Sequence, residues 1–550
     1  MGSEYIKRSP AELPKPPPET DSTLRPPRGL FQTLRHLGPG LIVAGAIVGS
    51  GELIMTTKTG AQAGISLLWL IIVGCIIKVF VQVELGRYAI TSGQTTLAAL
   101  NSLPGPKLIV HPVLWLWLAM MAATVLQLGG IVGGVGQAMA IAVPITGDYR
   151  ENLVVPGPDE LRFYVANRSA ERLQDDTWTS LNASQQDALR RRLSRTGDRL
   201  AAAAERGEFA LRSVQQNGTY EDPPTRDDKY WATAATLLTM LLLFSGRYSM
   251  IQGVSTVLVA CFTIATIANV IGLQTTEAYR LTTAEILSGL RFELPAGGDT
   301  RTAVATAMAT FGIIGVGATE LIAYPYWCLE KGYARFTGPF RDNAAWFVAT
   351  RGWLRVMRLD AFASMVVYTV ATLAFFVIGV AVLHQAGLDP DSSRMISTLA
   401  EAYAPVFGRT AQWVFLLGAV AVLYSTFLIA IAGQTRIYTD ALGLWGFLDR
   451  SDERVRQRAI SSLGVLLPAL CLLFFWMGLN PVQGVIASGV MQGLMLPVLA
   501  LASVYFRFRR THRQLAPSRV WDAFLMLSVF GMLLAGAWGA GVQVMKLAGS

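Results

Sequence analysis

The feature that most constrains this chain is a short pattern that occurs twice inside long apolar stretches. Residues 48–54 read Val-Gly-Ser-Gly-Glu-Leu-Ile, and residues 316–322 read Val-Gly-Ala-Thr-Glu-Leu-Ile. Each copy places small, helix-weakening residues directly before a carboxylate. A charged side chain at the centre of a membrane costs at least about 2.5 kcal/mol, so it usually marks an ion or substrate path. Two matched copies therefore predict paired broken helices around a central binding site.

The composition is that of a helical membrane protein. Of the 550 residues, 52% are hydrophobic and only 15% are charged, which excludes an ordinary soluble protein. A membrane-spanning helix needs roughly 20 mostly apolar residues. Eleven stretches meet this requirement, namely 37–58, 64–90, 112–143, 230–246, 249–273, 303–328, 360–385, 409–434, 458–478, 481–506 and 521–546.

The basic residues predict how these spans are oriented. They gather in the N-terminal tail and in the loops after the sixth, eighth and tenth spans, whereas the loop 386–408 contains Asp389 and Asp391 and few basic residues. The positive-inside rule places the N-terminus in the cytoplasm and the C-terminus outside, and we expect a bacterial inner membrane. The net charge of +9 therefore reflects topology and not a nucleic-acid partner.

The repeated patterns lie on spans one and six, so each unit contains five helices. An odd number of helices turns the second unit upside down, which predicts a 5+5 inverted repeat with discontinuous helices 1 and 6 and one extra C-terminal helix. The expected parts are a disordered cytoplasmic tail (1–36), helices 1–3 (37–146), an extracytoplasmic helical insertion (147–229), helices 4–5 (230–273), helices 6–10 (303–506) and helix 11 (521–546). The insertion is rich in helix formers and is expected to be a solvated cap, with a docking site for a protein partner as the alternative.

The two interrupted helices provide groups that can bind a cation. Freed carbonyls of a broken helix need partners inside a membrane, and a cation can be one of them. Carboxylates together with carbonyls suit Mg²⁺, Mn²⁺ or Ca²⁺. The predicted metal ligands are Glu52 and Glu320, with carbonyls near Gly49 and Ala318, and the wider substrate site adds Gly51, Thr319 and Gln434. Two close carboxylates would share a proton until a cation arrives, which gives a route to proton coupling.

A structural explanation of the same residues competes with this one. The glycines would only allow close helix packing, and the two glutamates would pair with Lys58, Lys78 or Arg87. Thr124 and Gln127 are weaker candidates for the path or for contacts between helices, and Glu84 and Arg87 are expected to form an internal ion pair at the membrane boundary. The matched positions of the two patterns favour the transport explanation.

Several other classes of protein are excluded. The four cysteines are widely spaced and fall in or beside apolar spans, so they predict buried thiols and neither a disulfide framework nor a zinc site. The four histidines form no cluster. There is no phosphate-binding glycine loop and no arrangement typical of nucleophilic catalysis. The sequence therefore predicts a protein that is not an enzyme and that needs no cofactor.

Several segments resemble the Nramp family of proton-coupled divalent-metal transporters, which have the LeuT-type inverted repeat. The resemblance rests on Leu37-Gly38-Pro39-Gly40, the pattern at 49–52, Thr59–Gly64, Leu67–Trp69, Leu85-Gly86, Thr91–Gly93, Gly317–Thr319, Ala432-Gly433-Gln434 and Leu496-Pro497. It covers about 30–510 without the insertion. It implies a LeuT-type fold and a transporter.

The resemblance also shows where this chain departs from the family. The family's metal-binding Asp and Asn align with Gly49 and Glu52, and its carbonyl-donating alanine aligns with Ala318. Its methionine ligand aligns with Leu321, and the following histidine aligns with Ala323. The soft thioether is thus replaced, which implies a weaker preference for transition metals.

These observations predict a secondary transporter that moves a divalent cation, Mg²⁺ or Mn²⁺ first, by alternating access. One alternative is an ion-coupled transporter of a small organic solute or amine. Another is a membrane sensor that transports nothing and binds a partner through its insertion. Membrane lipid and the transported cation or solute are the expected partners, besides a protein at 147–229.

Overall fold

The computed structural model describes residues 26–548 except 28, 180, 182, 206–212, 215–219, 222, 245–247, 296–299, 391–393, 450–451 and 479. Most of the predicted tail and Asp391 lie outside the described residues. Within the predicted tail, residues 30–36 form helix α1, and disorder of the tail stays a prediction.

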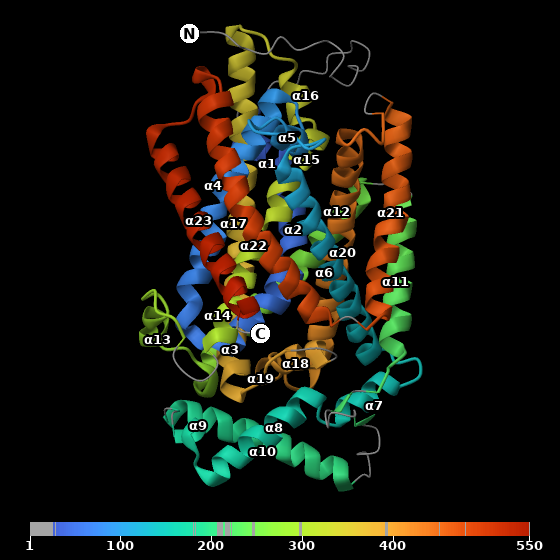
Figure 1. Cartoon of the computed structure of the whole chain (residues 1–550), viewed down its shortest axis with the longest axis vertical. Coiled ribbons are helices and arrows are strands. Elements are labelled where there is room, and N and C mark those ends of the chain that lie inside the picture. Colours follow the sequence, from blue (N-terminus) through green and yellow to red (C-terminus); the bar gives the residue numbers. More distant parts are fainter. Residues whose placement is uncertain are drawn as a thin grey trace.

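Long helices run along the length of the molecule and form one bundle (Figure 1). Eight segments among the described residues are long and apolar enough to cross a membrane: Gly51–Ser92, Pro112–Ala142, Ala303–Lys331, Ala344–His384, Ala411–Leu444, Glu453–Trp476, Pro481–Arg510 and Arg519–Gly539. The other predicted spans coincide with α2 (Pro39–Ile47), α11 (Asp227–Phe244) and α12 (Tyr248–Thr275). The count of eleven therefore stays a prediction, while the all-helical membrane fold is confirmed.

The bundle is built from thirteen helices in the described part of the chain. They are α2 (Pro39–Ile47), α3 (Thr57–Ala63), α4 (Leu68–Ser92), α6 (Pro112–Ala142), α11 (Asp227–Phe244), α12 (Tyr248–Thr275), α14 (Thr300–Ile313), α15 (Ala318–Lys331), α17 (Ala344–Ile378), α20 (Ala411–Leu444), α21 (Glu453–Trp476), α22 (Pro481–Tyr505) and α23 (Arg519–Ala548).

The other described α-helices and strands lie at the two ends of the bundle (Figure 1). The helices are α1 (Leu30–His36), α5 (Thr96–Asn101), α7 (Asp148–Val154), α8 (Pro158–Leu173), α9 (Asp176–Thr179), α10 (Ala183–Glu205), α13 (Thr283–Ser288), α16 (Tyr333–Thr337), α18 (Met395–Glu401) and α19 (Ala404–Phe407). Two short antiparallel strands, β1 (Ser213–Val214) and β2 (Tyr220–Glu221), pair with Ser213 opposite Glu221.

Small residues let the helices around the site approach closely. A Cβ atom on Gly312 of α14 would lie 2.0 Å from the carbonyl oxygen of Gly489 on α22. Such contacts between backbones are typical of packed membrane helices. Three cysteines are buried as predicted, but Cys261 is exposed, because it lies on an outer face of α12.

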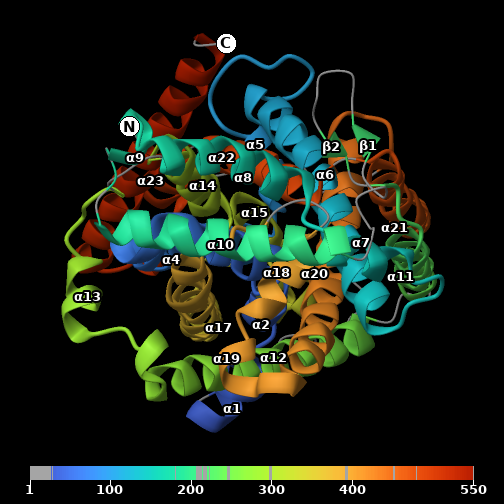
Figure 2. The same ribbon diagram turned by 90° about the horizontal axis from the view of Figure 1, so that it is seen from below.

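The insertion lies across one end of the bundle, with α8 and α10 roughly perpendicular to the long helices (Figures 1 and 2). Asp227 joins the two ends of the insertion, because its carboxylate accepts hydrogen bonds from the backbone nitrogens of Thr146 at 2.7 Å and Gly147 at 2.9 Å. Burial raises the pKa of Asp227, but these hydrogen bonds outweigh that effect and hold the pKa below its usual range.

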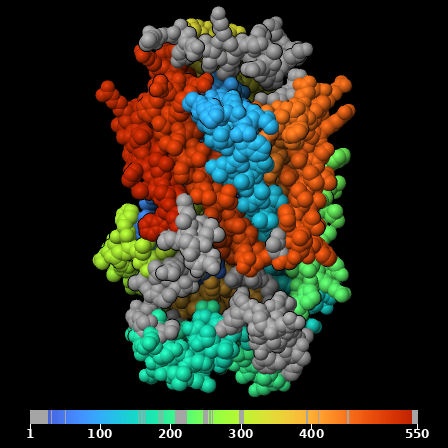
Figure 3. All heavy atoms as spheres, in the orientation of Figure 1, coloured from blue at the N-terminus to red at the C-terminus, as the bar shows by residue number. Residues whose placement is uncertain are grey.

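The insertion also contacts the segment around α18. Arg394 donates to the carbonyl oxygens of Asn152 at 2.7 Å and Leu153 at 3.1 Å, and Arg195 pairs with Glu401 at 3.2 Å. The turquoise surface of α8–α10 therefore caps the lower end of the molecule (Figure 3).

Candidate functional site

The second copy of the repeated pattern lies where the sixth span is interrupted. Helix α14 ends at Ile313, and α15 begins at Ala318. Gly315, between them, has a φ of 59°, a left-handed conformation that favours glycine. Glu320 lies in the first turn of α15, where the helix dipole favours a negative charge. The predicted discontinuity of this span is confirmed.

The first copy interrupts the first span in a different way. Helix α2 ends at Ile47, and a π-helix over Ser50–Thr56 follows a break at residues 48–49. Glu52 lies in the first turn of this π-helix. Single π-turns occur frequently at functional sites, because they shift side chains relative to a regular helix.

Glu52 connects the two interruptions. Its Oε1 accepts hydrogen bonds from Gly315 N at 3.3 Å and from the Thr372 hydroxyl of α17 at 3.1 Å. Its Oε2 is buried and has no hydrogen-bond partner among the described residues. A carboxylate of one repeat therefore contacts the broken backbone of the other.

A buried lysine lies at the same junction. Lys78 of α4 is fully buried, and its ammonium group donates to the carbonyl oxygen of Ile314 at 2.8 Å and to that of Phe311. Helices leave their last carbonyls without partners inside the helix, and these two carbonyls belong to the end of α14. Lys78 thus binds where the sequence predicts a cation.

The other two basic residues considered as partners bind elsewhere. Lys58 pairs with Asp389 at 2.7 Å, and Arg87 pairs with Glu84 at 3.1 Å, as the sequence predicts for the second pair. In the described part of the chain, neither carboxylate of the repeated pattern forms an ion pair. The two glutamates are therefore not held by simple salt bridges.

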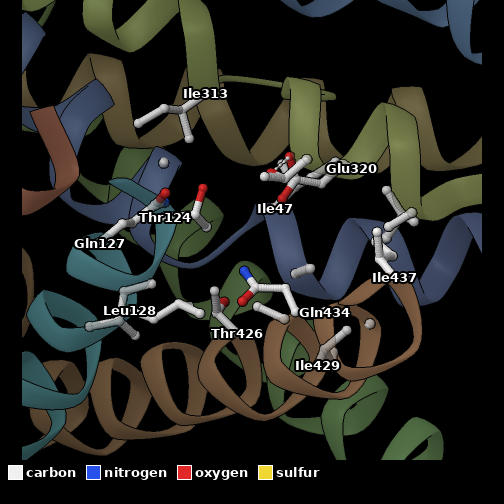
Figure 4. A pocket seen from close by; sticks show the side chains of 18 of the residues that line it. Ile47, Thr124, Gln127, Leu128, Ile313, Glu320, Thr426, Ile429, Gln434 and Ile437 are labelled. Carbon is white, nitrogen blue, oxygen red and sulfur yellow. Dashed lines mark hydrogen bonds between the residues drawn. The ribbon is translucent and has the colours of Figure 1, made fainter. Parts of the chain in front are cut away.

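A small cavity of about 50 Å³ lies between α2, α6, α15 and α20. This volume has room for about three or four water molecules. Its polar lining consists of Thr124, Gln127, Thr319, Glu320, Thr426 and Gln434. Glu320 and Gln434 reach the cavity from opposite walls (Figure 4). The Gln434 Oε1 atom is buried without a hydrogen-bond partner among the described residues.

A chain of hydrogen bonds extends from Glu320 across the bundle. The Thr319 hydroxyl donates to Glu320 Oε2 at 2.8 Å, and Thr319 N donates to Gln492 Oε1 at 3.4 Å. Gln492 then donates to Gln127 Oε1 at 3.2 Å, as does Ser488 at 2.6 Å. The network fixes the side chains of α15, α22 and α6 relative to one another.

The structure divides the predicted site residues into two groups. Gly51, Thr319, Glu320 and Gln434 line the cavity, whereas Gly49, Glu52 and Ala318 do not. The described residues contain no group of three or more His, Cys, Asp or Glu side chains placed to hold a metal. A cation here would have to use amide and hydroxyl oxygens beside one or two carboxylates.

Sequence reasoning missed two residues of the network. Gln492 and Ser488 are almost completely buried on α22. They are four residues apart in an apolar span, which places them on one face of a helix. That spacing is a usable signal, because polar side chains on one face of a membrane helix point into the bundle.

Replacing Gly49 with Ala is expected to lower the free energy of unfolding by about 1–3 kcal/mol. The new Cβ atom would lie 1.7 Å from Thr426 Oγ1 and 2.4 Å from Thr426 Cβ. Gly51→Ala is the matched control, because its nearest neighbour is the Ile313 Cγ2 atom at 3.0 Å. Thermal melting of the two purified variants tests the prediction, and equal melting temperatures would contradict it.

Comparison with known proteins agrees with this geometry. The family model described as natural resistance-associated macrophage protein-like, Nramp, matches residues 226–540, more than half of the chain. The chain belongs to the Nramp family. Nramp proteins are transporters and not enzymes, so this chain is an integral membrane protein that transports metal ions. Comparison with curated proteins finds no match.

Solved structures give the same fold. Two solved structures of the manganese transporter of Eremococcus coleocola match this chain. One is of a mutant, and the other is of a complex with an aromatic bis-isothiourea substituted compound. In both cases the TM-score is 0.56 at 14% identity, with 96% of each chain covered. The family match and the two interrupted spans confirm the LeuT-type fold for this Nramp protein.

Proposed function

We propose that this protein is a secondary transporter that carries a divalent cation, Mg²⁺ or Mn²⁺, by alternating access and in exchange with protons. The observation that carries the proposal is the Glu320 carboxylate, which lines a small polar cavity where the interrupted spans meet. Family membership supports metal-ion transport, and the cavity supports the choice of ion.

The donor atoms favour a hard cation. Glu320 offers carboxylate oxygens, Gln127 and Gln434 offer amide oxygens, and the lining threonines offer hydroxyls. Mg²⁺ and Mn²⁺ prefer such oxygen ligands. Met121 also lines the cavity, so its thioether keeps Mn²⁺ beside Mg²⁺ as a candidate. The small volume favours an ion over an organic solute.

Lys78 supports exchange with protons. Electrostatic interactions link its ammonium group to Glu52 and Glu320. A divalent cation that arrives near these carboxylates repels the ammonium charge, so release of a proton from Lys78 balances charge. The neutral amine keeps two N–H groups and still donates to the carbonyls of Phe311 and Ile314. We therefore propose that Lys78 carries the exchanged proton.

The orientation in the membrane is also part of the proposal. Helices α1 and α16 lie at the end opposite α8–α10 (Figure 1). The end with α1 and α16 carries the basic loops, including Lys331 and Arg335. We therefore place that end in the cytoplasm of a bacterial cell and the insertion outside.

Purified protein in liposomes is expected to take up Mg²⁺ or Mn²⁺ and to release protons in exchange. Calorimetric titration with each ion, with Ca²⁺ for comparison, measures binding independently of flux. Binding without uptake would favour the membrane sensor. The absence of binding by all three ions would favour an organic solute or amine.

A further inference from the structure

A second cavity lies at the end of the bundle opposite the insertion. It has a volume of about 1370 Å³, and its walls come from the segment before α1, the loop after α16, the first half of α17 and the start of α23. This cavity is separate from the one that contains Glu320, because the two share no lining residue.

The cavity is positively charged. Arg341, Arg355 and Arg358 line it, and none of its described lining residues is an Asp or a Glu. The Nε atom of Arg358 is buried and has no hydrogen-bond partner in the described part of the chain. Guanidinium groups that face one another without a carboxylate repel each other and attract an anion.

The carboxylate that interacts with Arg358 already has other partners. Glu84 interacts electrostatically with Arg358, but it pairs with Arg87 at 3.1 Å and accepts a hydrogen bond from Trp521 Nε1 at 2.7 Å. Arg87 also repels Arg358, as Arg355 does. The cluster of Arg87, Arg355 and Arg358 therefore has more positive than negative charge.

An apolar wall adjoins the charged one. Phe362 and Trp521 line the cavity. Trp521 packs on Phe80 with ring centroids 5.1 Å apart, and Phe80 stacks on Phe524 at 5.4 Å. Phe524 is half exposed on α23. Basic groups beside an exposed aromatic surface match a molecule with an anionic head and an apolar tail.

We propose that this cavity binds the phosphate-type head group of an anionic phospholipid from the cytoplasmic leaflet. Arg355 and Arg358 contact the head group, since guanidinium groups bind phosphate oxygens with paired hydrogen bonds. The acyl chains lie along Phe362, Trp521 and Phe524. Basic pockets between membrane helices on the cytoplasmic side bind such lipids in general. Binding here is independent of which ion is transported.

The test compares full-length protein in nanodiscs of phosphatidylcholine with and without phosphatidylglycerol. The anionic lipid is expected to raise the melting temperature, and native mass spectrometry is expected to show that it is retained. The variant with both Arg355→Gln and Arg358→Gln is expected to bind it roughly tenfold more weakly or worse. Arg509→Gln is the matched control, because Arg509 is an exposed arginine after α22 that does not line the cavity.

Three outcomes would overturn the proposal. One is an equal loss of binding in Arg509→Gln, which would indicate only a general surface charge. Another is an equal melting shift with inorganic phosphate alone, which would assign the site to a free oxyanion. The third is unchanged lipid binding in the double variant. The single variant Arg355→Gln keeps the test valid if the double variant folds poorly, since Arg355 is exposed.

Discussion

Glu320→Gln is expected to weaken binding of Mg²⁺ or Mn²⁺ by about 100-fold or more and to abolish uptake. Changes to groups that only support a metal ligand already cost about 10–100-fold in affinity, so loss of the charged ligand itself should cost at least as much. Glu320 is the one carboxylate among the described residues that line the small cavity, so the remaining amides and hydroxyls would bind a divalent cation without any opposing charge. Calorimetric titration measures the effect directly.

Glu330→Gln is the matched control for this experiment. Glu330 lies on the same helix, α15, but it pairs with Arg436 at the surface, where an ion pair contributes about 0–1 kcal/mol. We expect wild-type affinity in this variant. Unchanged cation binding in Glu320→Gln, in a protein that melts like the wild type, would exclude the cavity as the binding site.

Lys78→Met is expected to destabilise the protein and to uncouple ion uptake from proton release. The carbonyls of Phe311 and Ile314 would lose their buried donor, and each unsatisfied group costs about 1–3 kcal/mol. The junction would also lose the group that we propose to carry the proton. Melting in detergent measures the first effect, and a pH-sensitive dye inside liposomes measures the second.

Two further variants separate the structural role of Lys78 from its role in coupling. Lys78→Arg keeps a positive charge that does not deprotonate, so it should bind the ion poorly and independently of pH. Lys58→Met removes another buried lysine, which pairs with Asp389 away from the cavity, and should lower stability while proton release continues. Normal proton release in Lys78→Met would contradict the proposal.

Much of the fold could be predicted because it depends on local sequence. The apolar stretches, the glycines at the two interruptions and the acidic residues that follow them are all visible within about 20 residues, the length that a membrane imposes on a helix. The same reasoning predicts that Glu320 lies near the start of a helix, and it lies in the first turn of α15. That Glu320 lines the cavity and Glu52 does not could not be predicted in this way.

Side-chain direction depends on contacts between distant segments. Glu52 is held by Thr372, which is 320 residues away, and Thr319 is held by Gln492, which is 173 residues away. The repeated pattern predicts two equivalent carboxylates. Only Glu320 reaches the cavity, because the π-helix that carries Glu52 packs against α17 and the loop at Gly315.

The sequence by itself determined the membrane class, the Nramp resemblance, the two interruptions and the residue types available for binding. These follow from hydropathy and backbone preferences, which act between near neighbours in the chain. Only the tertiary structure decided that Lys78 binds the end of α14, that Gln492 and Ser488 join the site, and that three arginines share a cavity. Those arrangements arise from the packing of helices far apart in the sequence, and a local pattern such as the spacing of Ser488 and Gln492 does not specify which helices meet.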